Sequence, residues 1–594
     1  DTFESTEKED SFEDELFGEN NERLEKQRKE SIFAILGNPP YSARQTSGND
    51  NNKNNSYPII DEKIKNTYVK YSSVTNKNTL YDPLVRAFRW STDRVGEKGV
   101  IGFVTNNSFI DAPTTSGIRK CFYEDFNYLY VINLRGSVRG RSGDDAKREG
   151  QSVFDILTGV AICLLVKDGS NKHELKYFDI GDYLTRKNKL EKLAGLKSIS
   201  NIEWSNIIPD KNNDWINQRN EKYSEFISMD PEENGYFEVK SLGVSSNRDV
   251  WVSGFSKNNV NDNVIRMVDN VNSEIDRLKN IGDKKEKISQ LNSDPNFVSW
   301  SDGLRQVFAK GNKITIDQNS LKTYAYRPFT KKWIYYEKQI IERPRKWGSI
   351  FGESNKILLV PGNGSRRSFS CLIVDEIPDL NVLDAGAQGF SLYNKEMIHG
   401  SLGNNISSHI SAEFNLSAED LFYYTYAVLH SNDYRKKFDS NLTKELPRIP
   451  KLKNMNIYVE VGRKLADLHL NYESVPPYVE VEVESKKNPS YKVTKMKYPK
   501  KGVKDKIVFN SDITIKNIPE KAYEYIINGR SAIEWIIDQY QFKIDSKSGI
   551  VDDPNLYSDN ERYIFDLLLR IINVSVQTID LVNSLPPLEI IDVE

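Results

Sequence analysis

The first 235 residues contain short apolar runs that are separated by segments with helical spacing. The runs that predict strands lie at residues 32–37, 99–105, 128–134 and 159–167. The segments that predict helices lie at residues 22–29, 61–72, 81–95 and 115–126. Strands that alternate with helices at this spacing predict an α/β unit with a mainly parallel sheet. Because the first run is apolar throughout, we expect its strand to be buried on both faces.

Beyond about residue 235 the pattern changes. Aromatic residues, lysines and asparagines are interleaved there, and the apolar runs are short. A long charged helix is predicted at residues 262–291, and further helices at residues 418–430, 532–541 and 562–571. No repeat of solenoid length is present in the sequence. We therefore predict an α/β part over residues 1–235 and a mixed, irregular α+β part over residues 236–594.

The composition narrows the class of protein. The chain has 594 residues, with 82 Lys+Arg against 85 Asp+Glu and a net charge of -3. Its hydrophobic content of 38% excludes a wholly disordered chain. No uncharged apolar run reaches the roughly 18 residues of a membrane span, so we expect no membrane partner. Three cysteines and five scattered histidines predict neither a disulfide scaffold nor a metal site, and favour a cytoplasmic location.

The residues Asn38-Pro39-Pro40-Tyr41 directly follow the first predicted strand. Ligands of an open α/β sheet bind at the carboxyl ends of its strands, so this tetrapeptide is expected to line a crevice. The side-chain oxygen of Asn38 and the carbonyl of Pro39 can accept both hydrogens of an exocyclic amine, which directs the lone pair of the amine toward a methyl donor. Pro40 stiffens the turn, and the ring of Tyr41 can stack on the base. The pattern predicts methylation of a base amine.

The triplet Pro-Pro-Tyr alone does not carry this information. It occurs a second time at Pro476-Pro477-Tyr478, where we expect only a linker or a turn. The asparagine and the apolar strand before it distinguish the first copy from the second.

Several segments resemble one enzyme family. Residues 35–43 resemble the catalytic motif of DNA methyltransferases that modify the N6 amine of adenine. Further blocks resemble the C-terminal half of the Type ISP restriction–modification enzymes, in which nuclease, helicase-type ATPase, methyltransferase and target-recognition domains share one chain. These blocks occur in the family's order at residues 326–329, 333–336, 342–345, 434–438 and 528–536.

The resemblance implies a fold, a cofactor and a partner. The fold is a Rossmann-like methyltransferase sheet without its N-terminal part, followed by a mixed α+β target-recognition domain. The cofactor is S-adenosylmethionine, and the partner is double-stranded DNA. Phe154 lies in a segment that resembles the motif whose aromatic ring packs against the flipped base, with an ordinary core phenylalanine as the alternative. Asp1 and Phe3 lie in a segment that resembles the motif that holds the adenosine of the cofactor.

One feature of the family is absent from the sequence. Between an apolar strand and a helix there is no glycine-rich turn, which in this class seats the methionine part of the cofactor. Walker-type phosphate loops, helicase motifs and a nuclease carboxylate cluster are absent too. Because the chain begins at Asp1 and not at Met, we expect it to be covalently continuous with upstream cofactor-binding, helicase-type and nuclease domains.

Three basic stretches are candidates for DNA contact. The first, beside the predicted active site, contains Arg135, Arg139 and Arg141. The third, at residues 486–506, holds nine lysines and forms either a basic hairpin or a solvated flap. Basic residues among aromatic ones are a nucleic-acid signal, although a solvated surface is the alternative for each stretch. The second stretch has this mixed character, with Arg327, Lys331, Lys332, Arg343 and Arg345 among Tyr326, Trp333, Tyr335 and Tyr336.

These observations leave three hypotheses. The first is a site-specific adenine-N6 DNA methyltransferase region, residues 1–235, with its target-recognition domain, residues 236–594. In this hypothesis one adenine rotates out of the duplex into the pocket at Asn38 and Tyr41. The second is a DNA-binding specificity module without catalysis, because the cofactor turn is missing. The third is methylation of a protein glutamine or of RNA, since related motifs serve other amino groups.

Overall fold

The computed structural model divides the chain into two compact units. Unit 1 comprises residues 1–219 and unit 2 comprises residues 220–594. The boundary that the sequence predicts, after residue 235, falls near the start of unit 2. The structure describes residues 3, 23, 26, 29–40, 57–72, 74, 77–138, 143–350, 355–365, 367–394, 403–500 and 502–591.

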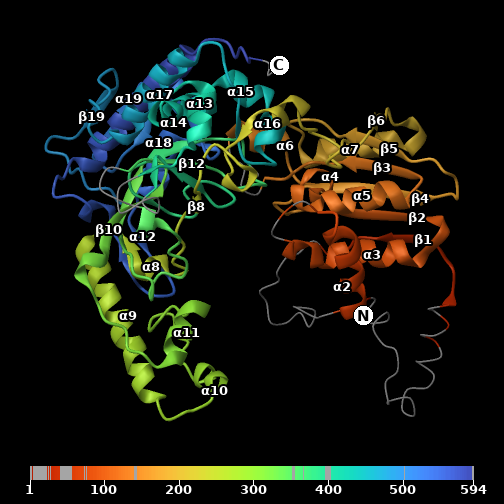
Figure 1. Ribbon diagram of the computed structural model, residues 1–594, viewed down its shortest axis with the longest axis horizontal. Coiled ribbons are helices and arrows are strands. Elements are labelled where there is room, and N and C mark those ends of the chain that lie inside the picture. The colour runs from red at the N-terminus through yellow and green to blue at the C-terminus, as the bar shows by residue number, and fades with distance from the viewer. Residues whose placement is uncertain are drawn as a thin grey trace. The chain divides into compact units, whose positions relative to one another are not determined.

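Unit 1 is built on one six-stranded sheet with the spatial order β1-β2-β4-β3-β5-β6 (Figure 1). β1 is parallel to β2, and β3 is parallel to β5. β4 runs antiparallel to both β2 and β3, and β6 runs antiparallel to β5. The strands are β1 (Ile32–Gly37), β2 (Val95–Asn106), β3 (Tyr128–Asn133), β4 (Val160–Lys167), β5 (Glu174–Asp179) and β6 (Ser205–Ile207).

The prediction of a mainly parallel sheet is only partly correct, because β4 and β6 run opposite to the other four strands. β4 follows β3 in the chain and lies between β2 and β3 in the sheet. Its first residues pair with the last residues of β2 and β3, so the connection from β3 returns at the edge where β3 ended. A connection that stays at one edge joins antiparallel strands, because a parallel partner needs a crossover to the opposite edge.

The prediction that the first strand is buried on both faces is wrong. Among the described strands, β1 pairs only with β2 and forms an edge of the sheet. The side chains of Phe33 and Leu36 are 70% and 78% exposed. An edge strand leaves one row of backbone groups unpaired within the sheet. Apolar composition alone therefore did not distinguish an interior strand from this apolar edge.

Helices cover both faces of the unit 1 sheet. On one face, α2, α3 and α5 share a core with Ile101, Phe103 and Val131. On the other face, α7 packs against Ile132 and the neighbouring apolar positions. Because successive side chains of a strand point to opposite faces, each central strand contributes to both cores. The helices are α2 (Pro58–Ile64), α3 (Pro83–Arg94), α4 (Ser108–Asp111), α5 (Ser116–Asp125), α6 (Gly143–Glu149) and α7 (Arg186–Leu196).

A buried ion pair holds the last segment of unit 1 against α5. A guanidinium nitrogen of Arg119 lies 3.0 Å from a carboxylate oxygen of Asp214, and both side chains are fully buried. Arg119 also donates to the backbone carbonyls of Asn213 and Ala112, at 2.7 and 2.8 Å. A charge is stable in a protein interior only when such partners replace its lost hydration.

Unit 2 contains several small sheets. Two have four strands, in the orders β14-β10-β11-β9 and β13-β12-β15-β8, and one has three, in the order β19-β21-β20. Their strands are β8 (Ser241–Leu242), β9 (Ser253–Gly254), β10 (Leu321–Arg327), β11 (Thr330–Tyr335), β12 (Ile357–Val360), β13 (Leu372–Val374), β14 (Ile377–Pro378), β15 (Gln388–Ser391), β19 (Glu482–Ser485), β20 (Ile507–Val508) and β21 (Ile513–Lys516). The two-stranded pairs are β7 (Ile227–Ser228) with β18 (Arg448–Ile449), β16 (Tyr393–Asn394) with β17 (Gly403–Asn404), β22 (Ile526–Ile527) with β23 (Arg530–Ser531), and β24 (Lys543–Ile544) with β25 (Val551–Asp552).

The helices of unit 2 pack these sheets into two large apolar cores. α14 is buried along nearly its whole length, as expected of a helix that is apolar on all sides. The helices are α8 (Asp249–Val252), α9 (Lys257–Arg277), α10 (Lys284–Ser289), α11 (Asp302–Lys310), α12 (Trp347–Ile350), α13 (Ser408–Phe414), α14 (Ala418–His430), α15 (Asn432–Lys437), α16 (Asp439–Leu442), α17 (Met455–Leu470), α18 (Ala532–Gln539) and α19 (Tyr563–Asn583).

The helix predicted at residues 262–291 is two helices, α9 and α10. The carboxylate of Asp283 accepts the backbone N–H of Glu286 at 2.8 Å and caps the start of α10. An N-cap residue has non-helical backbone angles, so a helix cannot continue through it. In Figure 1, α9 runs away from the sheets of unit 2, with α10 and α11 beside it. Within the part of the chain that the structure describes, no helix is long and apolar enough to cross a membrane.

Candidate functional site

The carboxyl edge of the unit 1 sheet gathers segments that the sequence singled out. β1 and β2 run in the same direction, so Asn38, directly after β1, lies at the edge where β2 ends. β3 and β5 end at this edge too, with Asn133 and Asp179. β4 begins there, and the segment before it carries Phe154. The topology therefore brings Asn38 and Phe154, 116 positions apart in the numbering, to one edge of the sheet.

The turn after β1 combines a buried anchor with an exposed side chain. Pro39 is buried, whereas Asn38 and Pro40 are exposed. A side chain on Gly37 would approach the ring of Phe103 to 3.2 Å, which indicates how tightly the end of β1 packs on β2. The turn is thus held by Pro39 while the amide of Asn38 is accessible to a ligand. Tyr41 lies outside the described residues.

A chain of polar side chains ties together the loops at this edge. The amide of Asn107 donates to Asn133 at 3.0 Å, and the amide of Asn133 donates to the hydroxyl of Tyr177 at 3.0 Å. That hydroxyl donates to Asp179 at 3.1 Å, and Arg135 donates to the same carboxylate at 2.6 Å. Burial is the main cause that raises the pKa of Tyr177 above its ordinary value. The chain connects the ends of β2, β3 and β5 and makes this edge rigid.

Asn107, Asn133 and Tyr177 are residues of this edge that the sequence analysis missed. The sequence does carry a signal for two of them, because Asn107 follows an apolar strand as Asn38 does, and Asn133 is the last residue of another. Gly159 is part of the same arrangement, since a side chain there would meet the amide of Asn107 at 2.5 Å. The role of Tyr177 has no comparable signal, because it depends on the pairing of β5 with β3.

The structure gives Arg135 a different role from the predicted DNA contact. Besides Asp179, its guanidinium pairs with Asp182 at 2.5 Å, and its side chain is 22% exposed. Two carboxylates therefore already balance its charge. Arg139 and Arg141 lie outside the described residues, and their predicted contact with DNA stays a prediction.

The predicted stacking and cofactor residues lie in different environments. Phe154 is 38% exposed, while its neighbour Val153 belongs to the core, so Phe154 is not an ordinary core phenylalanine. Phe3 is half-buried and meets the ring of Tyr57 edge-on at 5.4 Å. Asp1 is outside the described residues. The predicted roles of these residues remain predictions.

In unit 2, three of the predicted DNA-binding cations lie in buried ion pairs. Lys332 on β11 is 9% exposed and pairs with Asp552 on β25 at 2.7 Å. Arg327 on β10 pairs with Asp379 at 2.7 Å. Burial lowers the pKa of Lys332, and burial raises the pKa of Asp379 to about 6. These charges compensate one another inside unit 2.

Lys331 is partly buried, between two carboxylates. Its ammonium lies 2.7 Å from Glu376 and 3.0 Å from Glu473. Burial raises the pKa of Glu376 to about 7, against the opposing effect of Lys331. The predicted DNA contact of Arg327, Lys331 and Lys332 stays a prediction, and their carboxylate partners and low exposure make them less accessible to a phosphate than Arg343 is.

Arg343 and Arg345 have the opposite character. Arg343 is exposed and Arg345 is partly buried. The Nε of Arg345 is buried and finds no acceptor among the described residues. Burial and the neighbouring charge of Arg343 lower the pKa of Arg345. Among the described residues, neither guanidinium group has a carboxylate partner, and that of Arg345 is partly desolvated. The two groups therefore form a site that favours an anion.

The segment that carries these arginines is fixed at both ends. The backbone of Arg343 exchanges hydrogen bonds with Ser245, at 2.9 and 3.2 Å. The hydroxyl of Tyr336 donates to the carbonyl of Pro344 at 2.7 Å. The fully buried Trp347 donates from its ring to the carbonyl of Leu242 at 2.7 Å. The two guanidinium groups are therefore presented from a rigid backbone.

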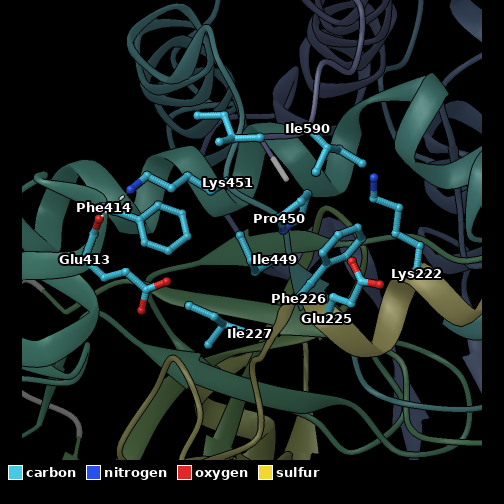
Figure 2. A pocket seen from close by; sticks show the side chains of 11 residues that line it. Lys222, Glu225, Phe226, Ile227, Glu413, Phe414, Ile449, Pro450, Lys451 and Ile590 are labelled. Atoms are coloured by element: carbon cyan, nitrogen blue, oxygen red, sulfur yellow. Dashed lines mark hydrogen bonds between the residues drawn. The ribbon is translucent and has the colours of Figure 1, made fainter. Parts of the chain in front are cut away.

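Figure 2 shows a small pocket elsewhere in unit 2, whose floor is apolar. Glu413 and Lys451 lie on one side of it, and Lys222 and Glu225 on the other. Its volume of about 30 Å³ has room for about two water molecules. The pocket is too small for a nucleoside. The apolar residues that line it are Phe226, Ile227, Phe414, Ile449, Pro450, Ile590 and Ile591.

Comparison with known proteins places the chain in a family. The family model of the Type ISP C-terminal specificity domain matches residues 235–567, more than half of the chain. The chain belongs to the Type ISP restriction–modification enzymes. The resemblance to Type ISP enzymes, which was inferred from the sequence blocks, is confirmed. A search of curated proteins found no match.

Three solved structures are similar to this protein over nearly the whole chain. A nuclease-deletion mutant of the Type ISP enzyme LlaGI, in complex with a DNA substrate mimic, is 47% identical with a TM-score of 0.91, over 100% of this chain and 56% of that one. The ATP-dependent Type ISP enzyme LlaBIII bound to DNA is 41% identical with a TM-score of 0.88, over 99% and 39%. The DrdV–DNA complex is 30% identical with a TM-score of 0.85, over 96% and 59%. The chain thus spans only about half the length of these relatives.

The division into buried and accessible cations predicts different effects on stability. We expect Lys332→Met to lower the free energy of unfolding by about 3 kcal/mol, because Asp552 then loses its cation in a mostly buried position. We expect Arg343→Gln to change it by less than about 0.5 kcal/mol, because that side chain is exposed. Urea unfolding of both variants measures the difference, and equal losses would contradict the division.

Proposed function

We propose that the chain is the adenine-N6 methyltransferase and target-recognition region of a Type ISP restriction–modification enzyme, which acts on double-stranded DNA in the cytoplasm. Unit 1 carries the chemistry, and unit 2 recognises the DNA sequence. The observation that carries the proposal is the exposed Asn38 on the stiff Asn-Pro-Pro-Tyr turn, at the carboxyl end of a sheet strand. The relatives LlaGI, LlaBIII and DrdV, all solved with DNA, support the choice of substrate.

We interpret the unit 1 sheet as the second half of a Rossmann-like methyltransferase sheet. The exposed edge of β1, with Phe33 and Leu36, supports this interpretation, because large apolar side chains on an edge strand favour a further strand beside it. In the longer protein the upstream sequence supplies that strand.

The residues of the turn hold the target adenine. The side-chain oxygen of Asn38 and the carbonyl of Pro39 each accept one hydrogen of the N6 amine, which directs the nitrogen lone pair away from the ring. Tyr41 and Phe154 stack on the two faces of the base. Because the adenine must leave the duplex to reach this edge, its rotation costs a few kcal/mol, which contacts with the DNA must offset.

The described residues do not form a complete site for S-adenosylmethionine. Phe3 already packs against Tyr57, and the sequence has no glycine-rich turn after a strand. S-adenosylmethionine supplies the methyl group when it is bound. We assign the binding of S-adenosylmethionine mainly to any sequence that precedes this chain in its gene. The residues of this chain are assigned only the binding of the target adenine.

Recognition of DNA in unit 2 rests on Arg343 and Arg345. A guanidinium group presents a fixed fork of donors that matches either two phosphate oxygens or the major-groove edge of guanine. The backbone of residues 343–347 is held by Ser245 at its start and by the buried Trp347 at its end, so both arginines have a fixed backbone before DNA arrives. Preorganisation of this kind lowers the entropic cost of binding.

A second candidate function is a DNA-binding specificity module without catalysis. The missing glycine-rich turn favours it. Calorimetric titration of the isolated chain with S-adenosylmethionine separates the two candidates. Stoichiometric binding argues against the pure module, whereas the absence of binding, together with methylation by the longer protein, assigns the cofactor to the upstream sequence.

The role of Asn38 predicts a loss of methyl transfer without a loss of folding. In the protein together with any sequence that precedes it in its gene, we expect Asn38→Ala to lower the single-turnover rate of methyl incorporation into cognate DNA about 100-fold or more. Asn171→Ala is the matched control, an exposed asparagine in the turn between β4 and β5, at the opposite edge of the sheet. A near wild-type rate for Asn38→Ala would reject the mechanism.

The role of the two arginines predicts a loss of DNA affinity. We expect the double substitution Arg343→Gln and Arg345→Gln to raise the Kd for cognate DNA about 10- to 100-fold at fixed salt, since each charged contact contributes about 1–3 kcal/mol. Arg305→Gln with Lys310→Gln on α11 removes the same charge and is the control. Fluorescence anisotropy measures both, and an equal effect of the two double variants would contradict the assignment.

A further inference from the structure

A second accessible basic surface of unit 2 lies between β19 and β20. Residues 487–500, which we call the lysine strap, contain no Asp or Glu. Five lysines of the strap are exposed, and among the described residues none of them has an ion-pair partner. These are Lys487, Lys492, Lys495, Lys497 and Lys500.

The lysine strap is not a free flap. Val493 and Met496 are each 1% exposed and belong to the core of unit 2. The side chain of Asn555 holds both backbone groups of Val493, at 2.8 Å each. Lys497 exchanges two backbone hydrogen bonds with Val508 of β20, at 2.9 and 3.1 Å. The apolar side chains and the backbone face unit 2, so the lysines are presented to solvent from a fixed track.

The neighbouring lysines show that the strap is distinct. Lys486, just before the strap, pairs with Asp512 at 2.7 Å. Lys504, after it, pairs with Glu534 at 2.9 Å. Asp512 and Glu534 are thus already engaged by lysines outside the strap. The five strap lysines repel one another, and an external polyanion would offset that repulsion more strongly than dilute counterions do.

We infer that the lysine strap binds the phosphate backbone of duplex DNA outside the bases that unit 2 recognises. This inference rests on the proposed function and adds a second contact surface to it. Lysine presents a compact point charge without the planar fork of arginine, so it suits phosphate contact more than recognition of base edges. A row of lysines fixed along a backbone can contact successive phosphates and carries no sequence preference.

The inference has a quantitative consequence in the salt dependence of binding. Each phosphate that a lysine neutralises contributes about 0.9 to the slope of log K against log salt concentration. Replacement of four strap lysines, Lys492, Lys495, Lys497 and Lys500, by glutamine removes up to four such contacts. The slope is then expected to fall by about 3–4. The affinities for cognate and non-cognate DNA fall by the same factor, so their ratio stays constant.

The test uses the full chain and two lengths of duplex DNA. One duplex ends close to the recognised bases, and the other extends past them on both sides. The strap variant is compared with a control that removes four exposed lysines elsewhere in unit 2: Lys279 after α9, Lys284 and Lys285 on α10, and Lys310 on α11. The expected result is a loss of affinity and of salt slope for the strap variant on the long duplex, with little change on the short one.

The outcomes separate this inference from the proposed function. If the wild-type chain binds cognate DNA and the strap variant binds both the short and the long duplex as tightly as the wild type does, the inference is wrong and the proposed function stands. If the control variant loses as much affinity as the strap variant, affinity follows total charge, and the inference is also overturned. If the wild-type chain does not bind DNA at all, the proposed function fails first.

Discussion

A buried cation must be paired with a carboxylate, and this constraint decides which basic residues of unit 2 can meet an external anion. Arg327 and Lys332 lie on neighbouring strands and satisfy the constraint with Asp379 and Asp552. Their ion pairs join the β10–β11 hairpin to distant segments of unit 2. Arg343 and Arg345 lie outside this network. The basic stretch at residues 327–345 is therefore divided by the fold into a part that stabilises unit 2 and a part that is accessible to an anion.

The direction of the strands has a comparable effect in unit 1. Because β1, β2, β3 and β5 all end at one edge of the sheet, the segments after them come together there. The antiparallel β4 adds the segment with Phe154 to the same edge. The polar chain from Asn107 to Arg135 then holds these segments in place. Chemistry and recognition are assigned in our proposal to different units, each with its own rigid support.

The sequence predicted local features of this protein better than long-range ones. The strand before Asn38 and the helix at residues 418–430 were predicted well, because their patterns are local. The edge position of β1 was not, since it depends on which strand lies beside it. The burial of Lys332 was missed because its partner Asp552 is 220 residues away. Residue type alone does not reveal whether a lysine has such a partner.

The most direct measurement is an exchange of unit 2 between two members of the family. Residues 220–594, in the protein together with any sequence that precedes it in its gene, are replaced by the corresponding residues of LlaBIII, and long-read sequencing of cellular DNA locates N6-methyladenine. The account predicts that the methylated sequence changes to that of the LlaBIII donor, because recognition belongs to unit 2. Methylation that stays at the original sequence would contradict the account.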